Sequence, residues 1–221
     1  MLLTFEGIDG SGKTTISRMV YEKLKYRIPQ IQYHEKSSTD FDHPYIRDQV
    51  SKLREVLWPP NLGEQKHNVF GDYYWLFLMA AWFSIQSVRL KSDRSQRNLI
   101  LFDSWYYRFV AKFINKGFDK EWLFSIFDAT DEPDLVVMLD IDPQLAWKRR
   151  SKFKNIEMGK WDGFSGDDFE SYCKYQAQIR QTLLQFAKER RWFVVYHTDG
   201  TTADEMSHLI FEYILSRHPN S

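Results

Sequence analysis

The stretch that decides the fold runs from Leu2 to Thr14 and reads LLTFEGIDGSGKT. Leu2 to Glu6 form an apolar run that predicts a buried strand, and Gly7 to Thr14 match the pattern G-x-x-x-x-G-K-[ST] in full. From Thr14 to Lys25 apolar side chains recur at helical spacing. A strand that passes through a glycine-rich loop into a helix is the context in which such a loop binds phosphate, so an incidental glycine turn is disfavoured.

Each part of this loop has an expected role towards a nucleotide. Glycines let successive backbone N–H groups curl around an anion, and the start of the following helix adds partial positive charge. We expect Lys13 to reach the β- and γ-phosphates of ATP, and the hydroxyl of Thr14 to hold Mg²⁺. The predicted nucleotide-binding set is Gly7, Asp9, Gly10, Ser11, Gly12, Lys13, Thr14 and Thr15.

Four further apolar runs follow, with helical patterns between them. Runs that are apolar on both faces are typical of parallel strands covered by helices. The predicted fold is therefore α/β: a P-loop NTPase with a doubly wound, five-stranded parallel sheet flanked by helices, in which residues 1–221 form a single domain. The other predicted strands are Ile31 to Glu35, Leu99 to Asp103, Leu135 to Ile141 and Trp192 to Tyr196. The other predicted helices are Pro44 to Leu57, Phe70 to Leu90, Pro143 to Arg150, Asp167 to Arg190 and Ala203 to Arg217, with a break at Pro59, Pro60, Asn61 and Gly63.

Composition excludes several classes of protein. The 221 residues are 43% hydrophobic and 27% charged, which argues against a disordered chain. Lysine plus arginine number 30, as do aspartate plus glutamate, so no overall field draws the chain to nucleic acid or an anionic membrane. The longest apolar stretch, Tyr73 to Ser84, is too short to span a bilayer. A single cysteine, Cys173, and the lack of a targeting segment favour a cytoplasmic protein.

A carboxylate at the end of a buried strand is needed near the loop to hold the metal. Asp103, which directly follows the run from Leu99 to Phe102, meets that requirement. Asp140 and Asp142 also follow a strand, but Pro143 comes next as in a helix start, so capping is the role we expect there. Thr14 and Asp103 are therefore the predicted metal-binding pair.

At these residues the sequence resembles the thymidylate kinase family, within the P-loop nucleoside monophosphate kinases. Phe5 to Thr15 are close to that family's opening signature, and Pro133 to Asp140 resemble one of its later strands. The resemblance covers nearly the whole chain. It implies transfer of the γ-phosphoryl of ATP to a nucleoside monophosphate such as dTMP, a mobile lid over approximately residues 150–166, and a homodimer.

The resemblance also implies roles for residues outside the loop. Asp9 matches the family's aspartate that contacts the 3′-hydroxyl of the acceptor sugar. Glu35 and Lys36 fall in a segment similar to the family's Glu-Arg-Ser-Thr, so Lys36 is expected to bind the acceptor phosphate, although a lysine lacks the arginine fork. A basic cluster lies at the lid, from which family members with glycine at the position of Gly10 supply a cation to the transferred phosphoryl. Within the cluster Lys148, Arg149, Arg150, Lys152, Lys154 and Lys160, we select Arg150 and Lys160 as catalytic, with Lys13 and Asp103.

Three departures from the family pattern fall in the expected acceptor pocket. Ser104 stands where the family has an arginine that steadies the acceptor phosphate, and Arg108, one turn later, is a candidate replacement. Leu78 aligns with the phenylalanine that stacks on thymine, and Trp82 with the arginine that hydrogen-bonds it. The tryptophans that could instead form a stacking wall, or could be core, are Trp82, Trp105 and Trp161.

The function predicted from the sequence is an ATP-dependent, thymidylate kinase-like phosphotransferase that uses Mg²⁺ and a small nucleotide acceptor. One alternative is a P-loop kinase of a modified nucleotide or another small metabolite. An alternative of another class is a slow nucleotide-hydrolysing switch or binding module. A kinase of nucleic-acid ends is disfavoured, because the net charge is zero and the basic cluster is short.

Overall fold

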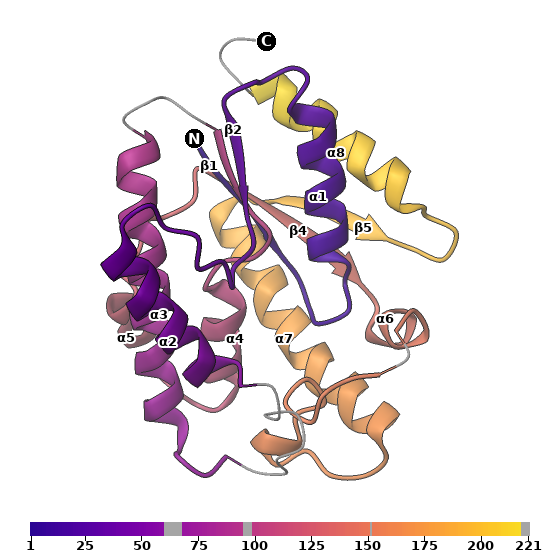
Figure 1. The fold of residues 1–221 in the computed structure, drawn as a ribbon. Helices are drawn as coiled ribbons and strands as arrows, with labels where there is room; N and C mark the ends of the chain where they lie inside the picture. Colours follow the sequence, from indigo (N-terminus) through magenta and orange to yellow (C-terminus); the bar gives the residue numbers. More distant parts are fainter. Residues whose placement is uncertain (60–67, 95–98, 151, 218–221) are drawn as a thin grey trace.

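The structure is a computed structural model that describes residues 1–59, 68–94, 99–150 and 152–217. In these residues five strands form one parallel sheet in the order β2-β3-β1-β4-β5 (Figure 1). The strands are β1 (Leu2–Glu6), β2 (Ile31–His34), β3 (Leu99–Phe102), β4 (Leu135–Ile141) and β5 (Phe193–His197). Parallel strands end at the same edge of a sheet, so the loops that follow β1, β2 and β3 meet there. The predicted doubly wound α/β fold is confirmed.

Alternate side chains of the strands pack on opposite faces of the sheet. Leu3 and Phe5 of β1 lie in the core beneath α1 (Lys13–Leu24) and α8 (Ala203–Arg217). Leu2 lies in the core of the other face, with side chains from α3 (Asp72–Arg94), α4 (Tyr107–Asn115) and α7 (Asp168–Arg190). Figure 1 shows this division, with α1 and α8 together on one side of the sheet. Burial on both faces explains why the strand sequences lack polar alternation.

Short polar side chains start several of the helices. Asp142 accepts a hydrogen bond from the Gln144 N–H at 2.8 Å at the start of α6 (Pro143–Lys148), which confirms the predicted cap. Asp167 accepts from the Glu170 N–H at 2.9 Å in the same way at α7. Asp119 caps α5 (Lys120–Ile126).

The sequence did not predict α4 or α5. Six of the nine residues of α4 are buried, and the signal that was overlooked is the recurrence of Arg108, Lys112 and Lys116 at a spacing of four residues. The helix predicted from Phe70 to Leu90 spans Asp72–Arg94, and α2 (Pro44–Leu57) packs against it. Pro60, Asn61 and Gly63 of the predicted break lie outside the described residues. Among those that are described, no helix is long and apolar enough to cross a membrane.

Candidate active site

The loop between β1 and α1 depends on its glycines. Gly10 and Gly12 have φ values of 84° and 89°, in the left-handed region that favours glycine. A Cβ on Gly7 would lie 2.6 Å from the Leu139 carbonyl oxygen, so only glycine fits beside β4. The loop thus leads into the N-terminus of α1 along a path that leaves backbone N–H groups available to an anion.

Lys13, Thr14 and Asp103 come together at the end of this loop. The Nζ of Lys13 donates to the carbonyl oxygens of Gly7 at 2.9 Å and Ile8 at 2.7 Å. The Oγ1 of Thr14 donates to Asp103 Oδ2 at 2.8 Å, although β1 and β3 are far apart in sequence. Hydroxyl and carboxylate oxygens are ligands that Mg²⁺ prefers, so this pair fits a magnesium ion that also contacts phosphate. The described residues contain no group of three or more acidic, histidine or cysteine side chains that could hold a metal without phosphate.

Burial changes the ionisation of the cations beside the loop. Burial, and then the charge of Arg108, lower the pKa of Lys13 to about 7. The same two causes lower the pKa of Lys36 to about 8. A bound phosphate would raise both values again, because an anion favours the charged form of a lysine. The site is therefore electrostatically suited to an anion.

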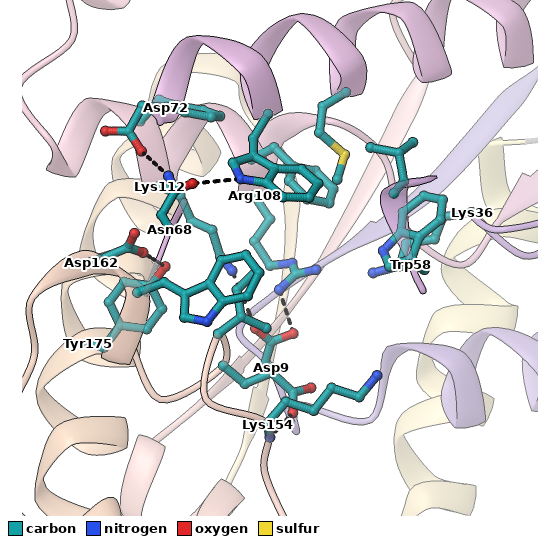
Figure 2. A pocket seen from close by; sticks show the side chains of 18 of the residues that line it. Asp9, Lys36, Trp58, Asn68, Asp72, Arg108, Lys112, Lys154, Asp162 and Tyr175 are labelled. Atoms are coloured by element: carbon teal, nitrogen blue, oxygen red, sulfur yellow. Dashed lines mark hydrogen bonds and ion pairs between the residues drawn. The ribbon is translucent and has the colours of Figure 1, made fainter. Parts of the chain in front are cut away.

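A cavity of about 440 Å³ opens beside the loop. It is bounded by the loop, the segment after β2, α2, α3, α4, α7 and the segment between α6 and α7 (Figure 2). Four carboxylates and six cations line it, a formal surplus of two positive charges that suits a phosphate dianion. The carboxylates are Asp9, Asp72, Glu157 and Asp162, and the cations are Lys36, Arg54, Arg108, Lys112, Lys116 and Lys154.

Asp9 joins the loop to this cavity. Its carboxylate forms an ion pair with Arg108, a side chain that is only 4% exposed, and lies 3.8 Å from the Nζ of Lys112. Burial alone would raise the pKa of Asp9, but Arg108 and Lys112 hold it well below its usual range. Gln176 of α7 accepts from the Asp9 N–H at 3.1 Å. Asp9 is thus a charged, fixed anchor for Arg108.

The end of the cavity away from Lys36 is polar and internally paired. Lys116 bridges the carboxylates of Asp72 and Asp162. Asn68 donates to Asp72 at 3.1 Å and accepts from Trp75 Nε1 at 2.8 Å. Figure 2 shows Asn68, Asp72 and Asp162 on the opposite side of Asp9 from Lys36 and Trp58.

No protein-family model matches the chain. A probable thymidylate kinase 1 of Saccharolobus solfataricus is 28% identical over 196 residues, which cover 88% of this chain and 87% of the relative. A probable thymidylate kinase of Methanosphaera stadtmanae is 25% identical and matches 97% of this chain and 99% of its own. The chain is thus similar to thymidylate kinases over most of its length. A crystal structure of thymidylate kinase from Ehrlichia chaffeensis superposes with a TM-score of 0.66 over 97% of this chain and 98% of its own; at 19% identity this likeness supports the fold alone.

Of the residues expected at the acceptor pocket of a thymidylate kinase, four line the cavity: Asp9, Lys36, Arg108 and Trp161. Glu35 lies outside it and pairs with Arg18. Leu78 packs against the core beside α3 and does not line the cavity. Ser104, at the position of the family's arginine, is buried, and its Oγ has no partner in the described part of the chain.

Of the tryptophans for which both a stacking wall and the core were open, Trp82 and Trp105 belong to the core, so their expected place in the acceptor pocket is corrected. Trp82 is 0% exposed, because Trp58, which does line the cavity, packs edge-on against it with ring centroids 4.9 Å apart. Its Nε1 donates to the Lys36 carbonyl oxygen at 2.7 Å. Trp105 is also 0% exposed and donates from Nε1 to the Asp131 carbonyl oxygen at 3.0 Å. Both side chains therefore support the loops around the site from beneath.

The two lid cations selected from the sequence do not reach the cavity either. Arg150 pairs with Glu157 at 2.8 Å. Lys160 donates to the Gly166 carbonyl oxygen at 2.8 Å and lies 3.4 Å from Asp168. These contacts hold the two cations within the lid, and their role at the transferred phosphoryl group stays a prediction. Ser151, within the predicted lid, lies outside the described residues.

Several residues that line the cavity of this protein were not predicted from the sequence. Lys112 and Lys116 follow Arg108 at intervals of four residues, a spacing that would have put three cations on one face of a helix if α4 had been recognised. Trp58 and Trp75 had no such signal. They come from different helices, and only the packing of α2 against α3 brings them to the same cavity.

Proposed function

We propose that the protein is an ATP-dependent kinase that transfers the γ-phosphoryl group to the phosphate of a nucleoside monophosphate, with dTMP among its acceptors. The observation that carries this proposal is the position of Asp9. It belongs at once to the phosphate-binding loop and to the wall of a separate, positively charged cavity. A donor phosphate on the loop and an acceptor phosphate in the cavity would therefore lie next to each other, as in-line transfer requires.

The chain's own residues account for binding and positioning. The loop N–H groups and Lys13 would hold the β- and γ-phosphates of ATP, with Gly7, Gly10, Ser11, Gly12 and Thr15 shaping or extending the loop. Lys36 and Arg108, which both line the cavity beside the Phe109 ring, would hold the acceptor phosphate. Arg108 takes the place left by Ser104, because its guanidinium is fixed by Asp9 and lines the cavity.

A magnesium ion would be held by Thr14 and Asp103 together with phosphate oxygens. When bound, the ion would neutralise part of the negative charge that develops on the transferring phosphoryl group. Asp103 also accepts from the Lys36 N–H at 2.6 Å, so it ties the acceptor-binding loop to the predicted metal ligand.

The decisive experiment measures ADP release with ATP, Mg²⁺ and a panel of nucleoside monophosphates and nucleosides. We expect release that depends on a monophosphate. The Lys13→Ala variant should lose about 10²-fold or more of the turnover, because it removes a charge that stabilises the transition state. Its melting temperature should stay close to that of the wild type, since the two hydrogen bonds that Lys13 would lose go to carbonyl oxygens of the loop.

Two results would contradict the proposal. ADP release at the same rate with and without every acceptor would favour the switch or binding module. Near-wild-type turnover by a folded Lys13→Ala protein would exclude catalysis at this loop. Activity confined to a modified nucleotide or another phosphorylated metabolite would favour the second candidate. Leu78 and Trp82 support that candidate, because neither of these base-reading positions of the family lines the cavity.

The metal assignment has its own test. Asp103→Asn should raise the Mg²⁺ concentration needed for half-maximal ADP release, because an amide oxygen binds a hard cation less strongly than a carboxylate does. Asp142→Asn, at the cap of α6, is the matched control and should leave the titration unchanged. An unaltered titration for Asp103→Asn would refute the assignment.

The homodimer and the cytoplasmic location stay predictions. Sedimentation equilibrium of the purified chain tests the first, and fractionation of cells tests the second.

A further inference from the structure

A buried amide side chain of α7 lies next to the phosphate-binding loop. Gln176 is 0% exposed. Its Oε1 accepts from the Asp9 N–H at 3.1 Å, and its Nε2 donates to Asp9 Oδ2 at 3.3 Å. The same Nε2 donates to the Glu157 carbonyl oxygen of the lid at 2.6 Å. A single side chain therefore joins the loop to the lid.

These bonds from α7 fix the orientation of Asp9. The Tyr172 hydroxyl, four residues before Gln176, donates to the Asp9 carbonyl oxygen. Gln176 holds the Asp9 N–H and Oδ2, and the other carboxylate oxygen, Oδ1, forms the ion pair with Arg108. A carboxylate that is held at its backbone and at one oxygen presents the other oxygen in a fixed direction. The position of the Arg108 guanidinium therefore depends on Gln176.

Packing of α7 alone does not account for a glutamine at this position. Ile179 and Leu183, which follow on the buried side of the helix, are apolar and 0% exposed. Burying an amide costs free energy unless its hydrogen bonds are formed, so an apolar side chain would serve packing better. The hydrogen bonds of Gln176 described above all go outside α7, to the loop and the lid. The glutamine thus holds two other segments together.

We propose that Gln176 is a positioning residue for phosphoryl transfer, which fixes the Asp9 carboxylate, and through it the Arg108 guanidinium, against the backbone of the lid. The inference rests on the proposed function and deepens it, because it names the group that couples the acceptor-phosphate site to the lid. Since one amide holds both partners, displacement of the lid backbone at Glu157 would also loosen Asp9. Arg108 would then be fully ordered only with the lid in place, and ordered charges are those that position and stabilise a transferring phosphoryl group.

The kinetic test compares Gln176→Met with Gln178→Met, the same substitution at an exposed glutamine of the same helix. With ATP, Mg²⁺ and dTMP, Gln176→Met should raise the KM for dTMP by about tenfold, because Arg108 loses its fixed anchor. The KM for ATP should change by no more than about twofold, since Lys13 and the start of α1 stay in place. Gln178→Met should match the wild type in both. Equal changes in the two KM values of Gln176→Met, or no change in either, would overturn the proposal.

Gln176→Glu provides a readout that a merely structural role would not move. When protonated, the new carboxyl group can still accept from the Asp9 N–H and donate one hydrogen bond; when ionised, it donates none and repels Asp9. Burial and Asp9 would raise its pKa, whereas the cations beyond Asp9 would lower it. Activity relative to the wild type should therefore fall as the pH rises from about 6 to about 8.5, and that of Gln176→Met should not depend on pH. Parallel pH profiles for the two variants would overturn the proposal. The charged and titratable groups that reach Asp9 or Gln176 are Arg108 and Lys112 of α4, Glu157 of the lid and Tyr172 of α7.

Hydrogen exchange of the ligand-free protein separates this inference from the proposed function. Gln176→Met should speed exchange of the Asp9 N–H and of the lid N–H groups in residues 153–158 by about fivefold, because the bonds that hold both segments are lost. Gln178→Met should leave these rates unchanged. Faster exchange in Gln176→Met, with no acceptor-dependent ADP release by the wild type, would refute the kinase and support the link between loop and lid. Unchanged exchange, with acceptor-dependent release by the wild type, would refute the positioning role and support the kinase.

Discussion

Glu6 is a buried carboxyl group directly before the phosphate-binding loop. It ends β1 with a side chain that is 0% exposed, and its Oε1 accepts from the Trp105 N–H at 3.1 Å while its Oε2 has no partner within the described residues. Burial raises the pKa of Glu6 to about 7, although Lys13 and Arg108 act to lower it. The carboxyl group therefore binds a proton more readily in the folded protein than in the unfolded chain.

This shift predicts how stability depends on pH. A group whose pKa is higher in the folded state stabilises fully below its unfolded pKa, near 4.5, and loses that contribution as the pH rises through its folded pKa of about 7. Glu6→Gln cannot ionise, so its free energy of unfolding relative to the wild type should increase between pH 5 and pH 7.5. Urea unfolding of both proteins at the two pH values measures the difference. A difference that is the same at both would show that the Glu6 pKa is not raised.

Among individual residues, those of the phosphate-binding loop could be predicted well from the sequence and those of the cavity poorly. Gly7 to Thr14 are contiguous, so local pattern alone fixes the loop and the helix that follows it. The cavity residues come from separate elements, and the two aligned positions on α3 were misplaced because alignment does not show that Trp58 lies between Trp82 and the cavity.

Among the elements, β4 and α7 are joined by a buried ion pair. Arg180 donates to Asp140 through two nitrogens, with the Nη2 bond at 2.8 Å, and the Asp140 side chain is only 2% exposed. Arg180→Met would leave a buried carboxylate without its partner, so we expect a loss of about 2 kcal/mol in the free energy of unfolding, moderated by the partial exposure of Arg180. Lys174→Met, which breaks an exposed pair with Glu170 on the same helix, should cost no more than about 0.5 kcal/mol.

Chemical denaturation of the two variants gives both values. Similar losses for Arg180→Met and Lys174→Met would mean that the Asp140 pair contributes no more than a surface pair. The pairing of Arg180 with Asp140 could not be predicted from the sequence pattern. Capping was the role expected from the sequence for Asp140 as well as for Asp142, and the structure corrects it for Asp140. The partner of Asp140 is 40 residues away on a helix whose rotation the sequence leaves open.

The lid is the element expected to move. Residues 152–166 have a turn at Lys154 to Met158 and a 3₁₀ helix at Lys160–Asp162, and Phe153 lies next to Gly10 of the loop. Entry of nucleotides would require this segment to open, and bound phosphates would oppose the opening. Hydrogen exchange in residues 152–166 should therefore slow when ATP and acceptor are both bound. Unchanged exchange would show that the lid does not respond to its ligands.

For the whole molecule, the fold class followed from five apolar runs, because a doubly wound sheet is the arrangement that buries such strands on both faces. The acceptor could not be predicted from these runs, since its binding depends on side chains that are far apart in the sequence and come together only in the complete fold. Trp58, Trp75 and Trp161 reach one cavity from α2, α3 and the lid. The tertiary structure, and no single motif, therefore determines what the cavity admits.

The architecture of that cavity predicts broad acceptor selectivity. A site discriminates strongly when a wrong ligand leaves buried polar groups unpaired, whereas apolar walls separate similar rings by only about 1 to 3 kcal/mol. Here Lys116 is already paired with Asp72 and Asp162, and Asn68 with Trp75. A base that forms no hydrogen bonds with these groups therefore leaves few of them unpaired. We expect kcat/KM for dTMP to lie within about 200-fold of the values for other nucleoside monophosphates. A dTMP preference of 10⁴-fold or more, measured in the same ADP-release assay, would mean that this network opens on binding and reads the base directly.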